Sequence, residues 1–128
     1  MRVKTLICNC KGLSTSFENA DMNTLPFKIE SELDVDYAIV HPQLCGIAGN
    51  KVLEDVLRSA DDEPDTLVIV GACGPDAQLR LFERVLRKTG FPQGSFLAVD
   101  VRDATNEGIL ARLRDKIEKS ACPDEKRR

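Results

Sequence analysis

The fold is decided by the stretch TLVIVGACGP, residues 66–75. Its first five residues are apolar or β-branched, a pattern typical of a strand that is buried on both faces of a sheet. Gly74 and Pro75 then predict the start of a helix, because proline is tolerated in the first helical turn. A buried strand that leads into a helix through a short turn is the repeating unit of a parallel α/β sheet.

Strand-like and helix-like segments alternate on both sides of this stretch. We expect further strands over residues 3–8, 37–40 and 96–101, and we expect the strand over 37–40 to be buried on both faces. Helices are predicted where apolar residues recur every three or four positions. The expected apolar stripes are Leu25, Ile29 and Leu33; Val52, Leu53, Val56, Leu57 and Ala60; Leu79, Phe82, Val85 and Leu86; and Ile109, Leu110, Leu113 and Ile117.

The expected ends of these helices follow from capping residues. Thr24 and Asn106 are predicted to cap the first and last helices at their amino ends. Gly49 is predicted to open the second helix, and Gly90 to end the third.

Four strands joined by helices predict a single three-layer α/β domain over residues 1–120. Its four-stranded sheet is expected to be mainly parallel and flavodoxin-like or Rossmann-like, with the order of the strands left open. Residues 121–128 are predicted to form a flexible polar tail.

Composition narrows the class of protein. The 128 residues carry a formal net charge of −3, which argues against a nucleic-acid binder. No apolar segment is long enough for membrane insertion, and the apolar run behind Arg2 and Lys4 is too short for a signal peptide. We therefore expect a cytoplasmic protein, in which cysteines serve as ligands, redox groups or buried thiols rather than as disulfides.

Four of the five cysteines follow predicted strands. Cys8 ends the first strand and Cys10 comes two residues later, while Cys45 and Cys73 lie in the turns after the second and third strands. The carboxyl ends of parallel strands share one edge of the sheet, where open α/β sheets bind their ligands. These four thiols are therefore expected to meet there. Cys122, in the predicted tail, has no assigned role.

The surroundings of these cysteines favour a bound metal group. Residues at i and i+2 in extended chain point to the same side, so Cys8 and Cys10 can face one target. The turns at Cys45 and Cys73 contain glycines that allow close approach of a bulky group, and both lead into helix amino ends that stabilise thiolates. We expect a shared iron–sulfur cluster, of the four-iron, four-sulfide type, or another metal site.

Other interpretations stay open. The domain is alternatively a docking module without redox activity, holding a structural zinc or no metal, or a thiol or persulfide relay in which Cys73 has a lowered pKa. Unrelated buried thiols are a further alternative. His41, the only histidine, is a candidate ligand, but a hydrogen-bonded histidine in a loop is favoured.

Three motifs resemble the amino-terminal domain of the heterodisulfide reductase A subunit and, more distantly, the delta subunit of methyl-viologen-reducing hydrogenase. They are ICNCKG at 7–12, LCG at 44–46 and VIVGACGP at 68–75. This chain departs from the family at 76–79, where a histidine is often found, and at 101–105, where a cysteine is often found. If that cysteine is a ligand, the cluster here is differently held.

The resemblance implies an electron-transfer subunit of an oxidoreductase complex rather than a stand-alone enzyme, with a redox protein as partner. It places the cluster ligands at Cys8, Cys10, Cys45 and Cys73. The flavin-binding part of the reductase subunit has no counterpart here, so a flavin role does not carry over. A homodimer stays open.

Overall fold

The computed structural model describes residues 2–10, 15–63 and 65–121. Four strands form one sheet in the order β2-β1-β3-β4, and each neighbouring pair is parallel. The strands are β1 (Arg2–Cys8), β2 (Tyr37–His41), β3 (Thr66–Ala72) and β4 (Phe96–Asp100). The helices are α1 (Leu25–Glu32), α2 (Ile47–Asp61), α3 (Pro75–Thr89) and α4 (Asn106–Ala121).

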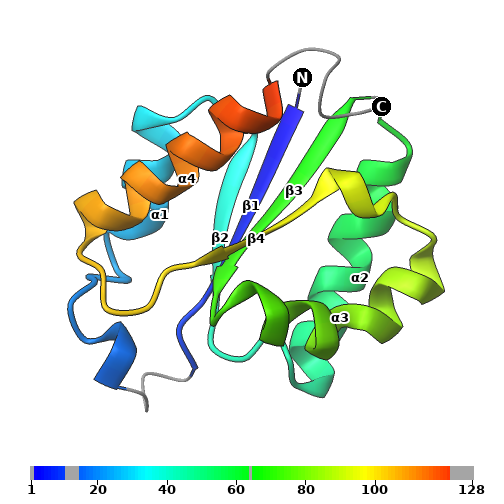
Figure 1. The fold of residues 1–128 in the computed structure, drawn as a ribbon, viewed down its shortest axis with the longest axis horizontal. Coiled ribbons are helices and arrows are strands. Elements are labelled where there is room, and N and C mark those ends of the chain that lie inside the picture. Colours follow the sequence, from blue (N-terminus) through cyan, green and yellow to red (C-terminus); the bar gives the residue numbers. More distant parts are fainter. Residues whose placement is uncertain (1, 11–14, 64, 122–128) are drawn as a thin grey trace.

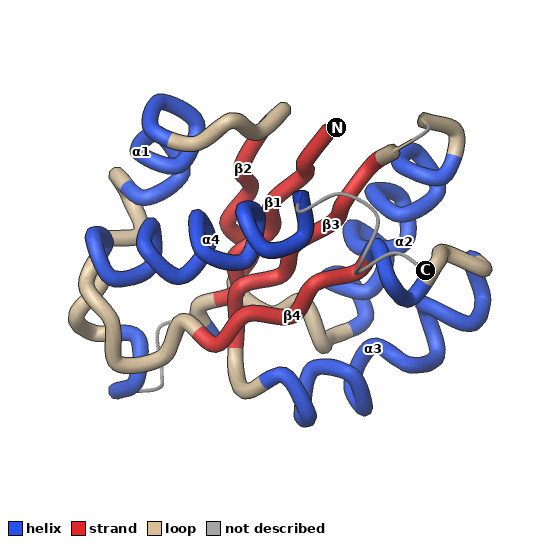
Figure 2. The backbone as a smooth tube through the Cα atoms, turned by 45° about the horizontal axis from the view of Figure 1, so that its top comes forward, coloured by secondary structure: helices blue, strands red, loops and turns tan. Residues whose placement is uncertain are grey.

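The helices cover both faces of the sheet. Figure 1 shows α1 and α4 on one side and α2 and α3 on the other, and Figure 2 shows the same three layers from another direction. The predicted α/β class is confirmed. The order 2-1-3-4 matches the first four strands of the flavodoxin-like arrangement, whose connections reverse direction between β1 and β3. None of the described helices is both long enough and apolar enough to cross a bilayer.

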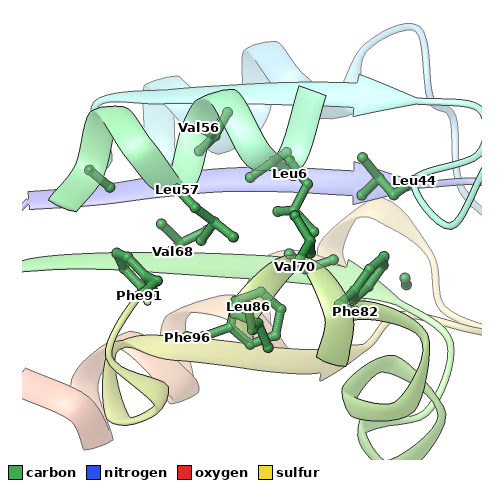
Figure 3. Close-up of a cluster of buried hydrophobic side chains, with 14 of the residues drawn as sticks. Leu6, Leu44, Val56, Leu57, Val68, Val70, Phe82, Leu86, Phe91 and Phe96 are labelled. Carbon is green, nitrogen blue, oxygen red and sulfur yellow. The ribbon is translucent and has the colours of Figure 1, made fainter. Parts of the chain in front are cut away.

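Each face of the sheet has its own apolar core. β3 is buried along its whole length and sends Val68 and Val70 to one core and Leu67 and Ile69 to the other. Figure 3 shows the first core, in which side chains of α2, α3 and β4 close over β1 and β3. Burying one large apolar side chain stabilises the fold by about 1.5–3 kcal/mol, so these two cores supply most of the driving force.

The prediction that the second strand is buried on both faces is wrong. Every residue of β2 is half-buried, because β2 lies at the edge of the sheet and pairs only with β1. Two other boundaries also differ. α2 begins at Ile47, two residues before Gly49, and β3 continues past Val70 to Ala72, next to Cys73.

One member of the predicted α3 stripe is also wrong. Leu79 is 49% exposed, whereas its neighbour Gln78 is fully buried beside Phe82, Val85 and Leu86. The predicted end of this helix is confirmed, since Gly90 takes the left-handed conformation with φ of 68° and donates its N–H to the Leu86 carbonyl.

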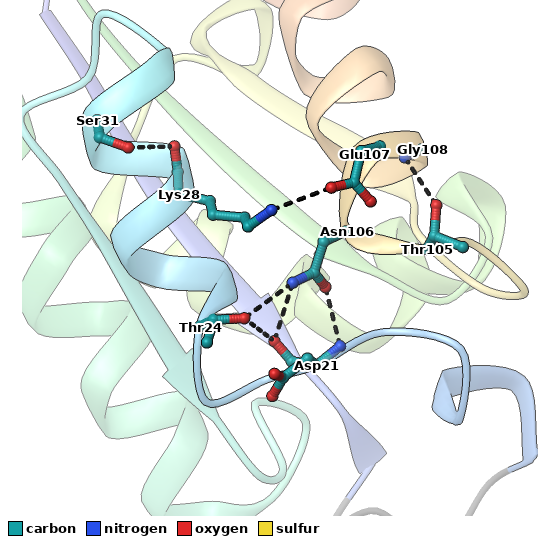
Figure 4. A network of polar contacts seen from close by, with 8 residues as sticks. All are labelled: Asp21, Thr24, Lys28, Ser31, Thr105, Asn106, Glu107 and Gly108. Atoms are coloured by element: carbon teal, nitrogen blue, oxygen red, sulfur yellow. Dashed lines mark hydrogen bonds and ion pairs between the residues drawn. The ribbon is translucent and has the colours of Figure 1, made fainter.

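The two residues predicted to cap helices, Thr24 and Asn106, instead take part in hydrogen bonds between segments far apart in sequence (Figure 4). Thr24 precedes α1 but makes no side-chain cap. Asn106 instead binds both backbone groups of Asp21 and the Thr24 hydroxyl, which ties the start of α4 to the segment before α1. The cap of α4 is Thr105, whose hydroxyl accepts the Gly108 N–H at 3.2 Å. The predicted tail lies outside the described residues, except for Ala121, the last residue of α4.

Candidate functional site

Four cysteines lie at the carboxyl edge of the sheet, and we call this group the thiol rim: Cys8, Cys10, Cys45 and Cys73. All four are free thiols. They come from the ends of β1, β2 and β3, and the first and last of these strand ends flank the point where the connections reverse direction. This crevice is the usual ligand site of a flavodoxin-like sheet.

The four thiols are close enough to influence one another electrostatically. The Cys10 thiol is acted on by Cys8, Cys73 and Cys45. The Cys73 thiol is acted on by Cys8 and Cys45. Chain topology therefore brings together sulfur atoms that are up to 65 residues apart in sequence, from Cys8 to Cys73.

Cys8 is the buried member of the rim, and the turn after β2 wraps around it. Its sulfur accepts the Leu44 N–H at 3.5 Å and lies 3.9 Å from the Pro42 carbonyl oxygen, to which its S–H donates. The turn after β2 therefore holds the Cys8 sulfur between one backbone donor and one backbone acceptor.

Cys10 has an exposed residue surface and an unusual backbone. Its φ is 51°, in the left-handed region that residues other than glycine rarely adopt. We expected Cys8 and Cys10 to face one target because the chain between them is extended. That reason is wrong, although the Cys8 thiol does act on the Cys10 thiol. Partial burial of the thiol and then the neighbouring thiols raise the pKa of Cys10. Residues 11–14, which follow it, lie outside the described residues.

Burial also raises the pKa of the Cys73 thiol. Its own backbone N–H and the Arg102 guanidinium oppose this rise but do not reverse it. The lowered pKa expected for a thiol relay at Cys73 is therefore not found. A metal group that binds these thiols as thiolates must displace their protons, so binding becomes more favourable as the pH rises.

The turn that carries Cys45 is fixed by α2. A β carbon on Gly49 would overlap the carbonyl oxygen of Gln43 and the Cα atom of Leu44. The Asn50 side chain donates to the Leu44 carbonyl at 2.7 Å and holds the turn against the helix. Gly49 is thus required by contact with its own chain, which replaces the expectation that it makes room for a bound group.

The turn that carries Cys73 is held by a residue that the sequence analysis missed. The buried Gln78 amide donates to the Cys73 carbonyl at 2.7 Å and to the Val99 carbonyl at 3.0 Å, and so links the ends of β3 and β4. Helical spacing does not single out this residue, because 78, 82 and 85 follow it as well as 79, 82 and 86 do.

The end of β4 carries the cation of Arg102, whereas the ends of the other three strands carry cysteines. Arg102 forms a two-point ion pair with Asp100, at 2.8 and 3.0 Å, which holds the pKa of that carboxyl below its usual range. A β carbon on Gly74 would lie 3.3 Å from an Arg102 nitrogen, so the guanidinium lies against the backbone beside Cys73. Arg112 fixes this segment by donating to the Asp100 and Arg102 carbonyls.

His41 ends β2 directly opposite Cys8 in the pairing of the strands. Its Nδ1 atom accepts the Gln43 N–H at 3.0 Å, as expected for a hydrogen-bonded histidine, and the residue is half-buried. Cys122 lies outside the described residues.

A scan of the chain against protein-family models and a search among curated proteins found no match.

The donor chemistry of the rim fits an iron–sulfur cluster. Thiolates are its usual ligands, and amide donors and partial burial tune its potential. Within residues 2–10, 15–63 and 65–121, no three histidine, cysteine or carboxylate side chains are gathered in a way that could hold a metal ion. A four-iron cluster is larger than one ion, so its ligands stand further apart than those of a single zinc ion.

Proposed function

We propose that this chain is an iron–sulfur electron-transfer protein or subunit, with a four-iron, four-sulfide cluster bound by Cys8, Cys10, Cys45 and Cys73. One observation carries the proposal: four free thiols from three strand ends act on one another at the carboxyl edge of a parallel sheet, where open α/β sheets usually bind ligands. The resemblance of the three cysteine motifs to the heterodisulfide reductase A subunit supports the same set of ligands.

Each part of the chain has a defined task in this proposal. The cluster, when bound, supplies one-electron exchange at iron. The Leu44 N–H and the backbone N–H of Cys73 stabilise thiolate charge. Gln78 and Asn50 hold the two turns in position, and the Arg102 cation favours the more negative, reduced state. Such a protein works in a reducing compartment, the cytoplasm, and docks on a redox partner or a larger oxidoreductase complex.

The test is metal analysis of protein prepared and reconstituted without oxygen. We expect brown protein with about four iron and four sulfide per chain and a one-electron reduced state visible by electron paramagnetic resonance. Serine substitution at each rim cysteine is expected to lower the iron content at least by half. The matched control is Cys122→Ser, which removes the fifth cysteine and should leave the iron content unchanged.

Two outcomes would overturn this function. Colourless, iron-free protein after reconstitution would remove the cluster. One equivalent of zinc without sulfide would favour the docking module with a structural metal.

The four cysteine variants are also expected to unfold at the same urea concentration as the wild type when metal-free, apart from Cys8→Ser, because only Cys8 is buried.

A further inference from the structure

A groove between α2 and α3 opens directly at Cys45. Its volume is about 540 Å³, and Cys45 itself forms part of its wall. Three cations line the groove, Lys51, Arg84 and Lys88, against one carboxylate, Glu54. This local excess of positive charge lies on a chain whose net charge is −3.

The carboxylate in the groove is already neutralised. Glu54 accepts from Arg58 at 3.0 Å and from Lys88 at 3.1 Å, and these two cations hold its pKa below the usual range. Lys51 is exposed and pairs only loosely with Asp55. Arg84 is exposed and makes no ion pair with any carboxylate in the described part of the chain. Lys51 and Arg84 therefore remain available to a negatively charged partner.

Apolar side chains accompany these cations. Ile47, the first residue of α2 and two residues from Cys45, is 96% exposed. Leu81, 47% exposed, lies on α3 one turn before Arg84 and Val85 and hence on the side of the helix that faces the groove. Apolar contact surrounded by complementary charge is the composition of a protein interface, in which charge steers the encounter and apolar residues add affinity.

We propose that the groove between α2 and α3 is the docking surface for an acidic one-electron carrier protein. This inference rests on the proposed electron-transfer function. The carrier places carboxylates against Lys51 and Arg84 and an apolar contact over Ile47, which brings its redox group to the side of the rim where Cys45 is exposed.

The test compares two charge reversals of equal size. The groove variant is Lys51→Glu with Arg84→Glu. The control is Lys119→Glu with Arg114→Glu on α4, on the opposite face of the sheet. Lys119 pairs with Asp115 at i−4 as Lys51 pairs with Asp55 at i+4, and Arg114, like Arg84, is exposed without an ion pair among the described residues.

Flavodoxin, an acidic carrier, serves as the probe. We expect the rate of electron transfer to flavodoxin to fall about tenfold in the groove variant at low ionic strength, and to stay within about twofold of wild type in the control. Raising the ionic strength to about 0.2 M should slow the wild type and remove most of the difference. Ile47→Ser should weaken association without changing its dependence on salt.

Equal losses in both charge variants, or no loss in either, would overturn the docking surface. A second measurement separates this failure from failure of the cluster. Docking needs no iron, so metal-free protein is titrated with flavodoxin while its backbone amide shifts are recorded. Shifts confined to the groove support the surface whatever the iron analysis gives, and their absence overturns it even if the cluster is present.

Discussion

The two edges of the sheet differ in how fully their polar and charged groups are partnered. At the amino edge, Lys4 is almost fully buried, with its ammonium 3.6 Å from Asp36 and 3.2 Å from Glu63 and 5.0 Å from the centre of the Tyr37 ring. Arg2 joins the same two carboxylates from the outside. Every charge in this cluster has a partner.

The carboxyl edge, by contrast, combines paired polar groups with unpaired ones. Four thiols act on one another there, and the Asn9 Oδ1 and Gln78 Oε1 atoms are buried without hydrogen-bond partners among the described residues. Residues with strained or unsatisfied groups concentrate where proteins bind ligands. The comparison supports the proposal that the amino edge stabilises the fold and that the carboxyl edge binds a ligand.

The largest effect is expected at the amino edge. Lys4→Met removes the buried ammonium and leaves Asp36 and Glu63 paired with the exposed guanidinium of Arg2 alone, so the free energy of unfolding should fall by about 2–3 kcal/mol. Urea denaturation measures this loss. Arg2→Met, which removes an exposed cation from the same carboxylates, should cost much less. Reduced iron content in refolded Lys4→Met protein would contradict the proposal that the amino edge serves stability and only the carboxyl edge binds the cluster.

A smaller loss is expected from Gln78→Met. The substitution keeps the volume but leaves the Cys73 and Val99 carbonyls without their donor, at a cost of about 1–2 kcal/mol in urea denaturation. Because the turn is then less fixed, the alkylation rate of Cys73 should rise while that of Cys45 stays constant. Gln93→Met, at an exposed glutamine, is the control, and an equal change in both alkylation rates would contradict a specific hold on Cys73.

The smallest effect concerns pH. In metal-free protein the pKa values of Cys10 and Cys73 are raised, so the unfolded chain loses these protons at a lower pH than the folded chain. The stabilisation is complete below the ordinary thiol pKa of about 8.5 and is lost as the pH rises through the folded values. The urea midpoint should therefore decline between about pH 8 and pH 10. The double variant Cys10→Ser with Cys73→Ser should decline less, and parallel curves would contradict these shifts.

The fold was largely predictable from the sequence, because β3 is a continuous apolar run and the helices carry clear periodic stripes. What failed depends on long-range placement. β2 has the composition of a buried strand, yet the packing of the whole domain places it at the sheet edge. Asparagine is a common helix-capping residue, yet the Asn106 side-chain amide binds the backbone of Asp21, 85 residues away.

The gathering of the four cysteines at one edge of the sheet was predictable from the sequence, but the residues that hold their turns in place were not. Strand ends alone suggested where four cysteines gather. Gln78 was missed because a buried amide in an apolar stripe is recognised only with its two carbonyl partners in view. Arg102 was missed because its closeness to Cys73 depends on how two turns pack across the end of β4.

Gly49 carries a consequence for the tolerance of this chain to mutation. The Gln43 and Leu44 backbone occupies the space where any other residue would place its first side-chain carbon. A survey of all single substitutions would therefore rank this glycine among the most constrained positions, together with the central leucines, although it has no side chain to lose. A residue can be indispensable for the room that it leaves to its neighbours.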